Sequence, residues 1–156
     1  MDPLMDDEQP SLGHIGRYEL LSRLGVGGMG EVFRARTIGP GGFEKHVVIK
    51  RILPHLAEDP VFVERFVEEG KLVVQLEHAS IAQVYDLGEE KGIPYLAMEY
   101  VDGRDLRDAM RLARGVDRLP SVEIRTQILV GILEALEYAH SVKDARGRPL
   151  GIIHRD

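Results

Sequence analysis

The sequence predicts an α+β fold in which a small, largely antiparallel sheet with one helix is followed by a helical region. Two observations support this prediction. Up to residue 100, short runs rich in β-branched residues alternate with glycine-containing turns, which is typical of strands. Beyond Val101-Asp102-Gly103, apolar residues recur instead at helical spacing. With 156 residues, of which 44% are hydrophobic, the chain can bury the core of one ordinary domain or of part of a larger one.

Five strands and one helix are expected in the first region. Residues 18–37 combine a strand, a glycine-rich turn and a second strand, and they therefore predict a hairpin. The helix should begin near Pro60, because Asp59 can cap its amino end and proline suits the first helical position. The remaining strands are expected at residues 47–53, 81–87 and 93–100.

Two helices are expected in the second region, over residues 106–113 and 121–142, with Pro120 before the second. The second helix carries an apolar face, which should pack against other elements. The residues of this face recur at helical spacing: Ile124, Ile128, Ile132, Leu136 and Ala139.

Residues 1–16 combine acidic residues, prolines and glycines without an apolar period, which predicts a disordered amino-terminal tail. This tail contains no Lys or Arg, so it has the wrong charge for a signal peptide. No apolar stretch of the chain approaches the roughly 20 residues of a membrane helix. We therefore expect a cytoplasmic chain with no membrane segment within it.

Composition argues against several classes of function. The formal net charge is -6 and the pI is about 5.5, so no overall basic field attracts nucleic acid, and none is expected as a partner. The sequence has no Cys, which excludes a disulfide framework, thiolate metal ligands and a cysteine nucleophile. A phosphate-bearing ligand would have to be held by local features.

One such feature is the pattern G-x-G-x-x-G, which begins at Gly25. Its glycines let backbone N–H groups approach phosphate oxygens without a side-chain clash. A flexible hairpin tip is the alternative interpretation. A dinucleotide-binding fingerprint would open a helix after the glycines, whereas residues 31–36 favour a strand. Val32, two residues after the last glycine, could cover a flat base.

Lys50 follows the β-branched run Val47-Val48-Ile49. Its neighbours two positions away on either side, Val48 and Ile52, are apolar. Because side chains alternate along a strand, we predict that Lys50 shares their face and that this face is buried. A buried ammonium requires an anion. The alternative is an edge-strand lysine whose charged head lies in water.

Glu69, on the helix that follows, is the candidate anion. At about 100° per residue it falls within an apolar arc of the helix, whereas Glu68 should face solvent. A pair between Lys50 and Glu69 would hold the ammonium toward a phosphate. A surface position for Glu69 is the alternative, because the helix also has a second apolar strip. The arc contains Phe62, Phe66, Leu72, Val73 and Leu76, and the strip contains Val63, Val67 and Val74.

The sequence ends with His154-Arg155-Asp156, which could be a polar loop when taken alone. The tripeptide becomes informative because of where it stands in the sequence. It follows the glycine-rich segment, the strand lysine, the helix glutamate and the stretch Met98-Glu99-Tyr100-Val101. In this order and spacing, the five features resemble the eukaryotic-like protein kinases, and residues 17–21, 25–35 and 95–103 resemble their bacterial serine/threonine branch.

The resemblance covers about Arg17 to Asp156 and implies a protein-kinase-like fold. Residues 17–100 would form the N-lobe, with its antiparallel sheet and one helix. Residues 101–156 would form the hinge and the first helices of a truncated helical C-lobe.

The resemblance also implies a role for each matching residue. Lys50 would contact the α- and β-phosphates of ATP, Glu69 would position Lys50, and Asp156 would be the catalytic base that orients the substrate hydroxyl. The ATP-binding residues would be Leu24, Gly25, Val26, Gly27, Gly28, Met29, Gly30, Val32, Val48, Lys50, Met98, Glu99, Val101 and Asp105.

Within the hinge, the resemblance makes Met98 the gatekeeper. The backbone of Glu99 and Val101 would bond the adenine edge, and Asp105 could reach the ribose. Four features within the chain depart from the family pattern: Val48 and Gly70 stand where Ala is usual, Ala79-Ser80 stands where a Pro-Asn pair is frequent, and residues 143–150 resemble a short insertion.

By the same resemblance, the full-length protein would transfer the γ-phosphoryl group of Mg-ATP to Ser or Thr hydroxyls of protein substrates. The Mg²⁺ ligands of the family would follow Asp156, so no metal ligand is expected within this chain. The 156-residue chain is expected to be inactive by itself. The alternative is a kinase-like regulatory or binding module that transfers no phosphate.

Overall fold

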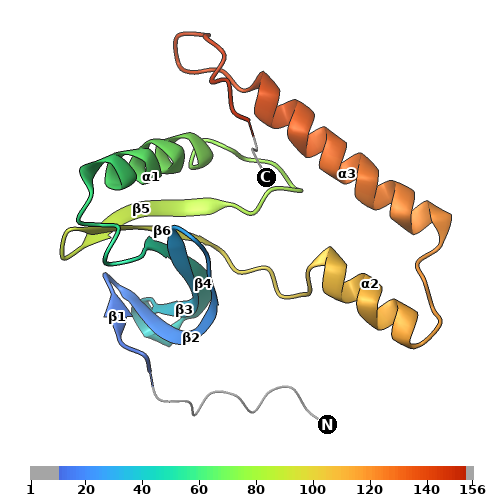
Figure 1. Cartoon of the computed structure of the whole chain (residues 1–156), viewed down its shortest axis with the longest axis horizontal. Coiled ribbons are helices and arrows are strands. Elements are labelled where there is room, and N and C mark those ends of the chain that lie inside the picture. The colour runs from blue at the N-terminus through green and yellow to red at the C-terminus, as the bar shows by residue number, and fades with distance from the viewer. Residues whose placement is uncertain (1–10, 154–156) are drawn as a thin grey trace. The chain divides into compact units, whose positions relative to one another are not determined.

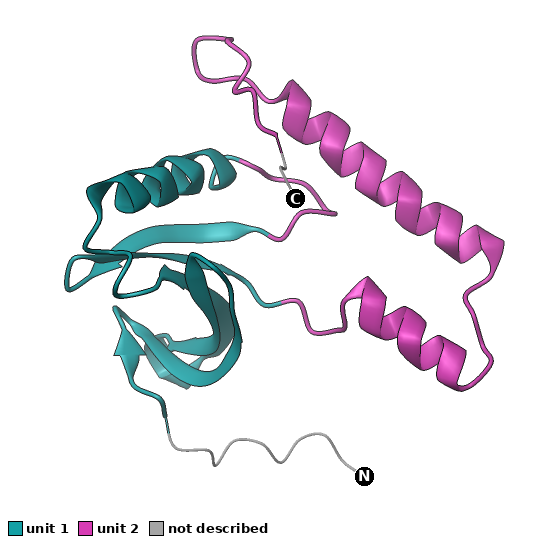
Figure 2. Ribbon diagram, in the orientation of Figure 1, with its two compact units in different colours: residues 1–75, 83–100 teal, residues 76–82, 101–156 magenta. Residues whose placement is uncertain are grey.

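The computed structural model describes residues 11–153 of the chain (Figure 1). The chain divides into two compact units, which Figure 2 draws in different colours. Unit 1 comprises Met1–Gln75 and Gln83–Tyr100, and unit 2 comprises Leu76–Ala82 and Val101–Asp156.

Unit 1 is built on a six-stranded sheet in which every neighbouring pair is antiparallel. The strand order is β1-β2-β3-β4-β6-β5, so β4 lies between its sequence neighbour β3 and the later strand β6. This confirms the predicted antiparallel sheet. The strands are β1 (His14–Ile15), β2 (Tyr18–Val26), β3 (Gly30–Ile38), β4 (Glu44–Ile52), β5 (Val84–Glu90) and β6 (Ile93–Glu99).

Short local turns connect most of these strands. A one-turn 3₁₀ helix, η1 (Pro40–Gly42), joins β3 to β4. The turn between β5 and β6 consists of Lys91 and Gly92, both with positive φ. This backbone is that of the two-residue turns whose twist matches a β-hairpin, and glycine is the residue that adopts it most readily.

The core of unit 1 lies on one face of the strongly curled sheet (Figure 1). Buried and half-buried residues alternate along β3 and β4, as expected for strands with one face toward a core. The cluster consists of Ile15, Tyr18, Leu20, Phe33, Ala35, Val47, Ile49, Tyr95 and Ala97.

Helix α1 (Pro60–Val73) packs against β5 and β6. Its amino end forms as the sequence suggests, with the Asp59 carboxylate accepting a hydrogen bond from Val61 N at 2.9 Å. Gly70 is the buried residue of this helix. A Cβ there would lie 3.0 Å from a methyl of Leu96 and 3.1 Å from one of Leu87, so the missing side chain allows a close helix–sheet approach.

The sequence missed strand β1. The predicted disordered tail extended to residue 16, but His14–Ile15 pairs with β2 and Ile15 is 1% exposed. The prediction is therefore wrong for these two residues, since one buried isoleucine and two ladder positions give no periodic signal. Residues 1–10 of that tail lie outside the described residues.

The predicted strand at residues 81–87 is displaced toward the carboxyl end, because β5 spans Val84–Glu90. A turn precedes it: Ile81 N donates to His78 O at 3.0 Å, and Ser80 N donates to His78 Nδ1 at 3.1 Å. Hydrogen bonds between local polar groups form this turn, so no pattern of apolar residues marks it in the sequence.

Unit 2 contains two helices, α2 (Leu106–Gly115) and α3 (Val122–Ser141). Both have side-chain caps at their amino ends. The Asp105 carboxylate accepts from Asp108 N at 2.7 Å, and the Ser121 hydroxyl accepts from Ile124 N at 3.4 Å. The predicted helical region is thus present.

The segment Leu76–Ala82 packs on the carboxyl-terminal half of α3 through Tyr138. The Tyr138 hydroxyl accepts a hydrogen bond from Glu77 N at 3.0 Å. The ring of Tyr138 stacks on His78, with 5.2 Å between centroids. Ala139 is the buried residue of α3, so this end of the predicted apolar face has a partner.

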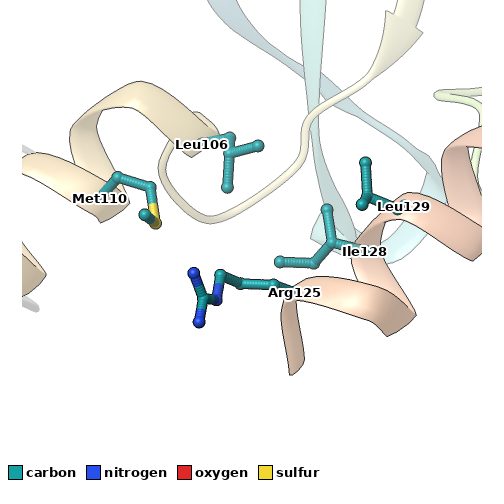
Figure 3. A pocket seen from close by; sticks show the side chains of 5 residues that line it. All are labelled: Leu106, Met110, Arg125, Ile128 and Leu129. Atoms are coloured by element: carbon teal, nitrogen blue, oxygen red, sulfur yellow. The ribbon is translucent and has the colours of Figure 1, made fainter. Parts of the chain in front are cut away.

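The other end of that face is open. Ile124 and Ile132 are about half exposed, and Leu129 and Leu133 are more so. Between α2 and α3 a shallow hollow of about 220 Å³ is present, and Figure 3 shows Leu106 and Met110 of α2 opposite side chains of α3. It is lined by Leu106, Met110, Arg125, Ile128 and Leu129.

The expected insertion at residues 143–150 is an ordered hairpin. Lys143 and Pro149 form a bridge, and Gly147 has a φ of 75°. The Asp144 carboxylate accepts from Arg146 N at 2.8 Å and from Arg148 N at 2.9 Å. The backbone hydrogen bond from Arg148, then the Arg148 side chain, and to a smaller extent the Arg146 amide lower the pKa of Asp144.

Among residues 11–153, no helix has the length and apolar character needed to cross a membrane.

Candidate functional site

The glycine-rich segment forms the turn between β2 and β3. Gly27 N donates to Gly30 O at 2.7 Å, which closes the turn, and Leu53 N donates to Met29 O at 3.2 Å. The register between β2 and β3 shifts between Arg23 and Gly25. The segment is therefore an ordered hairpin tip, held to the end of β4 by a backbone hydrogen bond.

The glycines of this tip have two different environments. A Cβ at Gly25 or Gly28 would meet no atom within 4 Å, so space above these backbones is open. A Cβ at Gly30 would lie 2.8 Å from the carbonyl oxygen of Arg51, a distance that side chains do not tolerate. Gly30 is thus required by the sheet, whereas Gly25 and Gly28 leave room for a ligand to approach the backbone.

Apolar side chains of the tip are directed to solvent. Leu24, Val26 and Met29 are all more than half exposed. They form no core with the rest of unit 1, so the tip has apolar surface available for a flat ligand.

Four predicted site residues occupy one continuous face of the sheet. Val32 of β3 lies directly opposite Lys50 of β4, and Val48 of β4 lies directly opposite Met98 of β6. Residues paired across antiparallel strands, and residues two apart on one strand, share a face. This site face of Val32, Lys50, Val48 and Met98 is continuous with the glycine-rich tip.

The predicted ion pair is present: Lys50 Nζ lies 3.8 Å from Glu69 Oε1. Within residues 11–153 it is Glu69, and not its neighbour Glu68, that pairs with Lys50. The contact joins the strand of the site face to helix α1 and holds the ammonium by a carboxylate. At 3.8 Å it is an ion pair rather than a short hydrogen bond.

The predicted burial of these two groups is wrong. The side chain of Lys50 is 40% exposed and that of Glu69 is 59% exposed. In β4 it is Val47 and Ile49 that face the core, so Lys50 lies on the opposite face. Ile52 is buried although it is two residues from Lys50, so burial does not alternate strictly at the end of the strand.

Glu69 lies beside the buried stripe of α1 rather than within it. The buried position is Gly70, whose missing side chain would leave no mark in a hydrophobic pattern. The helical wheel therefore centred the apolar arc on Glu69, whereas the buried position is the next residue, Gly70.

Predicted hinge residues are distributed over both units, and each is described in its own unit. In unit 1, Glu99 N donates to Gln83 O at 2.8 Å, and the Glu99 carboxylate accepts from Gln83 N at 3.1 Å. In unit 2, Val101 is 65% exposed and Asp105 caps α2. The cap gives the Asp105 carboxylate a structural use that the sequence did not indicate.

Asp156, with His154 and Arg155, lies outside the described residues. In the described part of the chain, no cluster of three or more His, Asp or Glu side chains could hold a metal ion.

One charged pair near the tip was missed by the sequence analysis. Glu31 Oε1 accepts a hydrogen bond from Arg51 Nε at 2.7 Å, and the Glu31 side chain is only 9% exposed. The only sign of this pair in the sequence is that Glu31 adjoins Val32 and Arg51 adjoins Lys50, which are both predicted site residues. Pairing itself depends on the strand register, which the sequence does not specify.

Residues 18–156 match the family model of the protein kinase domain. Among curated proteins, the chain is 40% identical over 147 residues to the tyrosine-protein kinase MasK of Myxococcus xanthus, covering 94% of this chain and 23% of that protein. It is 41% identical over 145 residues to the probable serine/threonine-protein kinase SCO3848 of Streptomyces coelicolor, covering 90% of this chain and 19% of that protein.

Solved kinase domains give the same result. The PknI kinase domain of Mycobacterium tuberculosis superposes with a TM-score of 0.65 at 32% identity, covering 95% of this chain and 54% of that one. The chain thus spans about a fifth of the length of the curated relatives and about half of the solved domain. The match over nearly all its length, together with the sheet, helix and Lys50–Glu69 pair, shows that this chain belongs to the protein kinase domain family.

Proposed function

We propose that this chain is the ATP-binding part of a protein kinase that transfers the γ-phosphoryl group of ATP to Ser or Thr hydroxyls of protein substrates. The observation that carries the proposal is the Lys50–Glu69 ion pair at 3.8 Å, on a strand whose next neighbour presents Val32 and the glycine-rich tip. A cation held by a carboxylate beside an open backbone turn suits the phosphates of a nucleotide.

The residues present fit ATP. Open space above Gly25 and Gly28 lets backbone N–H groups approach phosphate oxygens. The site face offers apolar cover for a base through Val32 and Val48. The exposed tip side chains Leu24, Val26 and Met29 extend this cover. ATP, when bound, supplies the γ-phosphoryl group, and ADP is the leaving group.

Each residue then has a defined task. Lys50 neutralises charge on the α- and β-phosphates, and Glu69 holds the Lys50 ammonium in place. Asp156 accepts the proton of the substrate hydroxyl as the base. Met98 bounds the base pocket at the sheet, while the backbone of Glu99 and Val101 bonds the adenine edge.

Asp105 is assigned to the ribose by the resemblance, although its carboxylate also caps α2. The family uses Mg²⁺ with ATP, and its ligands are expected in sequence that follows Asp156. The cytoplasmic location expected from the sequence belongs to the same proposal, because cytosolic ATP would be the donor.

Labelled-phosphate transfer from ATP to a generic Ser/Thr substrate tests the proposal. Three preparations are compared: the 156-residue chain, a version extended through a complete kinase domain, and the extended version with Lys50→Met. We expect activity only in the extended version and a loss of several orders of magnitude with Lys50→Met, because Lys50 stabilises charge that develops in the transition state. An extended chain that transfers no phosphate would refute the proposal.

A tyrosine-containing substrate belongs in the same assay, because one relative is named a tyrosine-protein kinase. Preferential labelling of tyrosine would refute the Ser/Thr assignment while leaving phosphotransfer intact. The alternative function, a kinase-like regulatory or binding module, would be favoured if the extended chain were inactive and the 156-residue chain bound a protein partner tightly.

A further inference from the structure

Glu31 is the buried charged residue of the described chain, at 7% exposure, and the proposed phosphotransfer does not use it. A carboxylate removed from water is unfavourable unless it is paired and hydrogen-bonded. Arg51 supplies this pairing, with Nε 2.7 Å from Glu31 Oε1. The Arg51 guanidinium also lies 5.3 Å from the centroid of the Phe33 ring, which restricts its position.

The position of this pair is its most informative property. Glu31 and Arg51 are direct partners in the β3–β4 register, one step from the Val32–Lys50 pair. Glu31 also follows Gly30, whose backbone already lies against the carbonyl of Arg51. The ion pair thus joins the outgoing arm of the glycine-rich tip to the strand that carries Lys50.

The side chains of the tip contribute little packing, because Leu24, Val26 and Met29 are more than half exposed. Its backbone is held by the Gly27–Gly30 and Leu53–Met29 hydrogen bonds and by the ends of the β2–β3 and β3–β4 ladders. A buried ion pair adds a directional restraint, because a slip of the strand by one residue would carry Glu31 to the other face of the sheet and leave Arg51 without its partner.

We propose that the Glu31–Arg51 ion pair is a positioning element that fixes the glycine-rich tip relative to Lys50 and so raises the affinity of the kinase for ATP. This inference rests on the proposed function. Neither residue touches the nucleotide, since both lie on the core side of the sheet, opposite Val32 and Lys50. Their effect therefore acts on the Michaelis constant for ATP rather than on the chemical step.

The test uses the full-length protein and the variant Glu31→Met/Arg51→Met, which replaces the pair by apolar side chains of similar length and avoids an unpaired buried charge. The matched control is Glu19→Gln. Glu19 pairs with Arg36 Nε at 2.8 Å across β2 and β3, away from the tip.

We expect the double variant to raise KM for ATP by about fivefold or more with kcat changed less than about twofold, and Glu19→Gln to leave both near wild type. Amide hydrogen exchange of residues 27–32 without nucleotide should be about tenfold faster in the double variant and unchanged in the control. A wild-type KM in the folded double variant, or an equal rise in Glu19→Gln, would overturn the inference.

Should the double variant fail to fold, Glu31→Asp decides the question. It keeps the charge but withdraws the carboxylate by one methylene, so we expect KM for ATP to rise by about threefold. A wild-type KM in this variant overturns the inference. If the wild-type protein binds no ATP, the proposed function fails, whereas the hydrogen-exchange comparison still decides whether the ion pair orders the tip.

Discussion

Units 1 and 2 bury their apolar residues to very different degrees. Unit 1 encloses a cluster of nine buried residues between its curled strands and covers β5 and β6 with α1. In unit 2, α3 has Ala139 as its buried residue, while Leu129 and Leu133 are 60% and 64% exposed. A sheet with its own core can be stable alone, whereas two helices with open apolar faces need further partners.

This difference separates two sequence signals that look alike. Apolar residues in β4 and in α3 both indicate that these elements need burial, yet only those of β4 are largely buried within the described residues. A run or a periodic pattern of apolar residues therefore indicates that an element needs a partner, and not whether the partner lies in the same stretch of chain. Four predictions test this comparison.

The largest expected effect contrasts a core residue of unit 1 with an apolar residue of α3. Ile49→Ala should lower the free energy of unfolding by about 2–5 kcal/mol, because Ile49 is fully buried and the deletion leaves a cavity. Leu133→Ala should change it by less than about 0.5 kcal/mol, because Leu133 is mostly exposed. Urea unfolding of the 156-residue chain measures both. Equal losses would break the comparison.

The second prediction concerns association. Leu129→Lys/Leu133→Lys should reduce binding of a hydrophobic dye by about half or more, because these side chains form contiguous exposed surface on α3. The matched control is Ile38→Lys/Phe43→Lys in unit 1, whose two residues are also exposed. Dye fluorescence and light scattering are measured at equal concentration. If dye binding fell more in the control variant, the surface responsible for association would lie on unit 1.

A smaller effect is expected at Gly70, where two influences oppose each other. Alanine favours the helix by about 1 kcal/mol, but its Cβ would lie 3.0–3.1 Å from methyls of Leu96 and Leu87. We expect Gly70→Ala to be neutral or to destabilise by about 1 kcal/mol.

Gly70→Ala should become favourable when Leu87→Ala removes two of the three close contacts. The double-mutant cycle should therefore show a coupling of about 0.5–1 kcal/mol in unfolding by urea. Strict additivity of the two substitutions would mean that α1 moves freely on the sheet and that its position does not depend on the missing side chain.

The smallest effect is local, at the hairpin of unit 2. The folded pKa of Asp144 is lowered by the amides of Arg148 and Arg146, so the ionised carboxylate stabilises the hairpin above the ordinary pKa of 3.8. This contribution is lost as the pH falls through the lowered folded pKa. The protection of the Arg146 and Arg148 amides against exchange, relative to an unstructured chain at the same pH, should fall in that acidic range, and Asp144→Asn should remove this pH dependence of the protection. Identical profiles for both proteins would contradict the assignment.

The sequence predicted most elements of the fold, because each of these has a local signal. Asp59 and Pro60 mark the start of α1, and the glycines after residue 24 mark the tip of the first hairpin. It also predicted that Glu69, and not Glu68, would reach Lys50, since that choice depends only on helical geometry.

Features that depend on strand register or on the absence of a side chain could not be predicted from the sequence. The Glu31–Arg51 pair requires the β3–β4 register, and the depth of Glu69 depends on how closely Gly70 lets α1 approach the sheet. Lys50 was assigned to the buried face because both faces of β4 carry valine or isoleucine. Alternation of side chains does not show which of two apolar faces is buried, so the exposure of Lys50 could not be predicted from the sequence.

The strand order has a consequence for the path of folding. Strands β1 to β4 are joined by short local connections, and β5 and β6 form a second hairpin, whereas β4 meets β6 only after α1 and β5 have intervened. Closing that longer connection costs more chain entropy, so the β4–β6 seam should form last. Until then β4, which carries Lys50, presents an open edge from Val47 to Arg51. A nascent chain is most exposed to pairing with another copy during this interval.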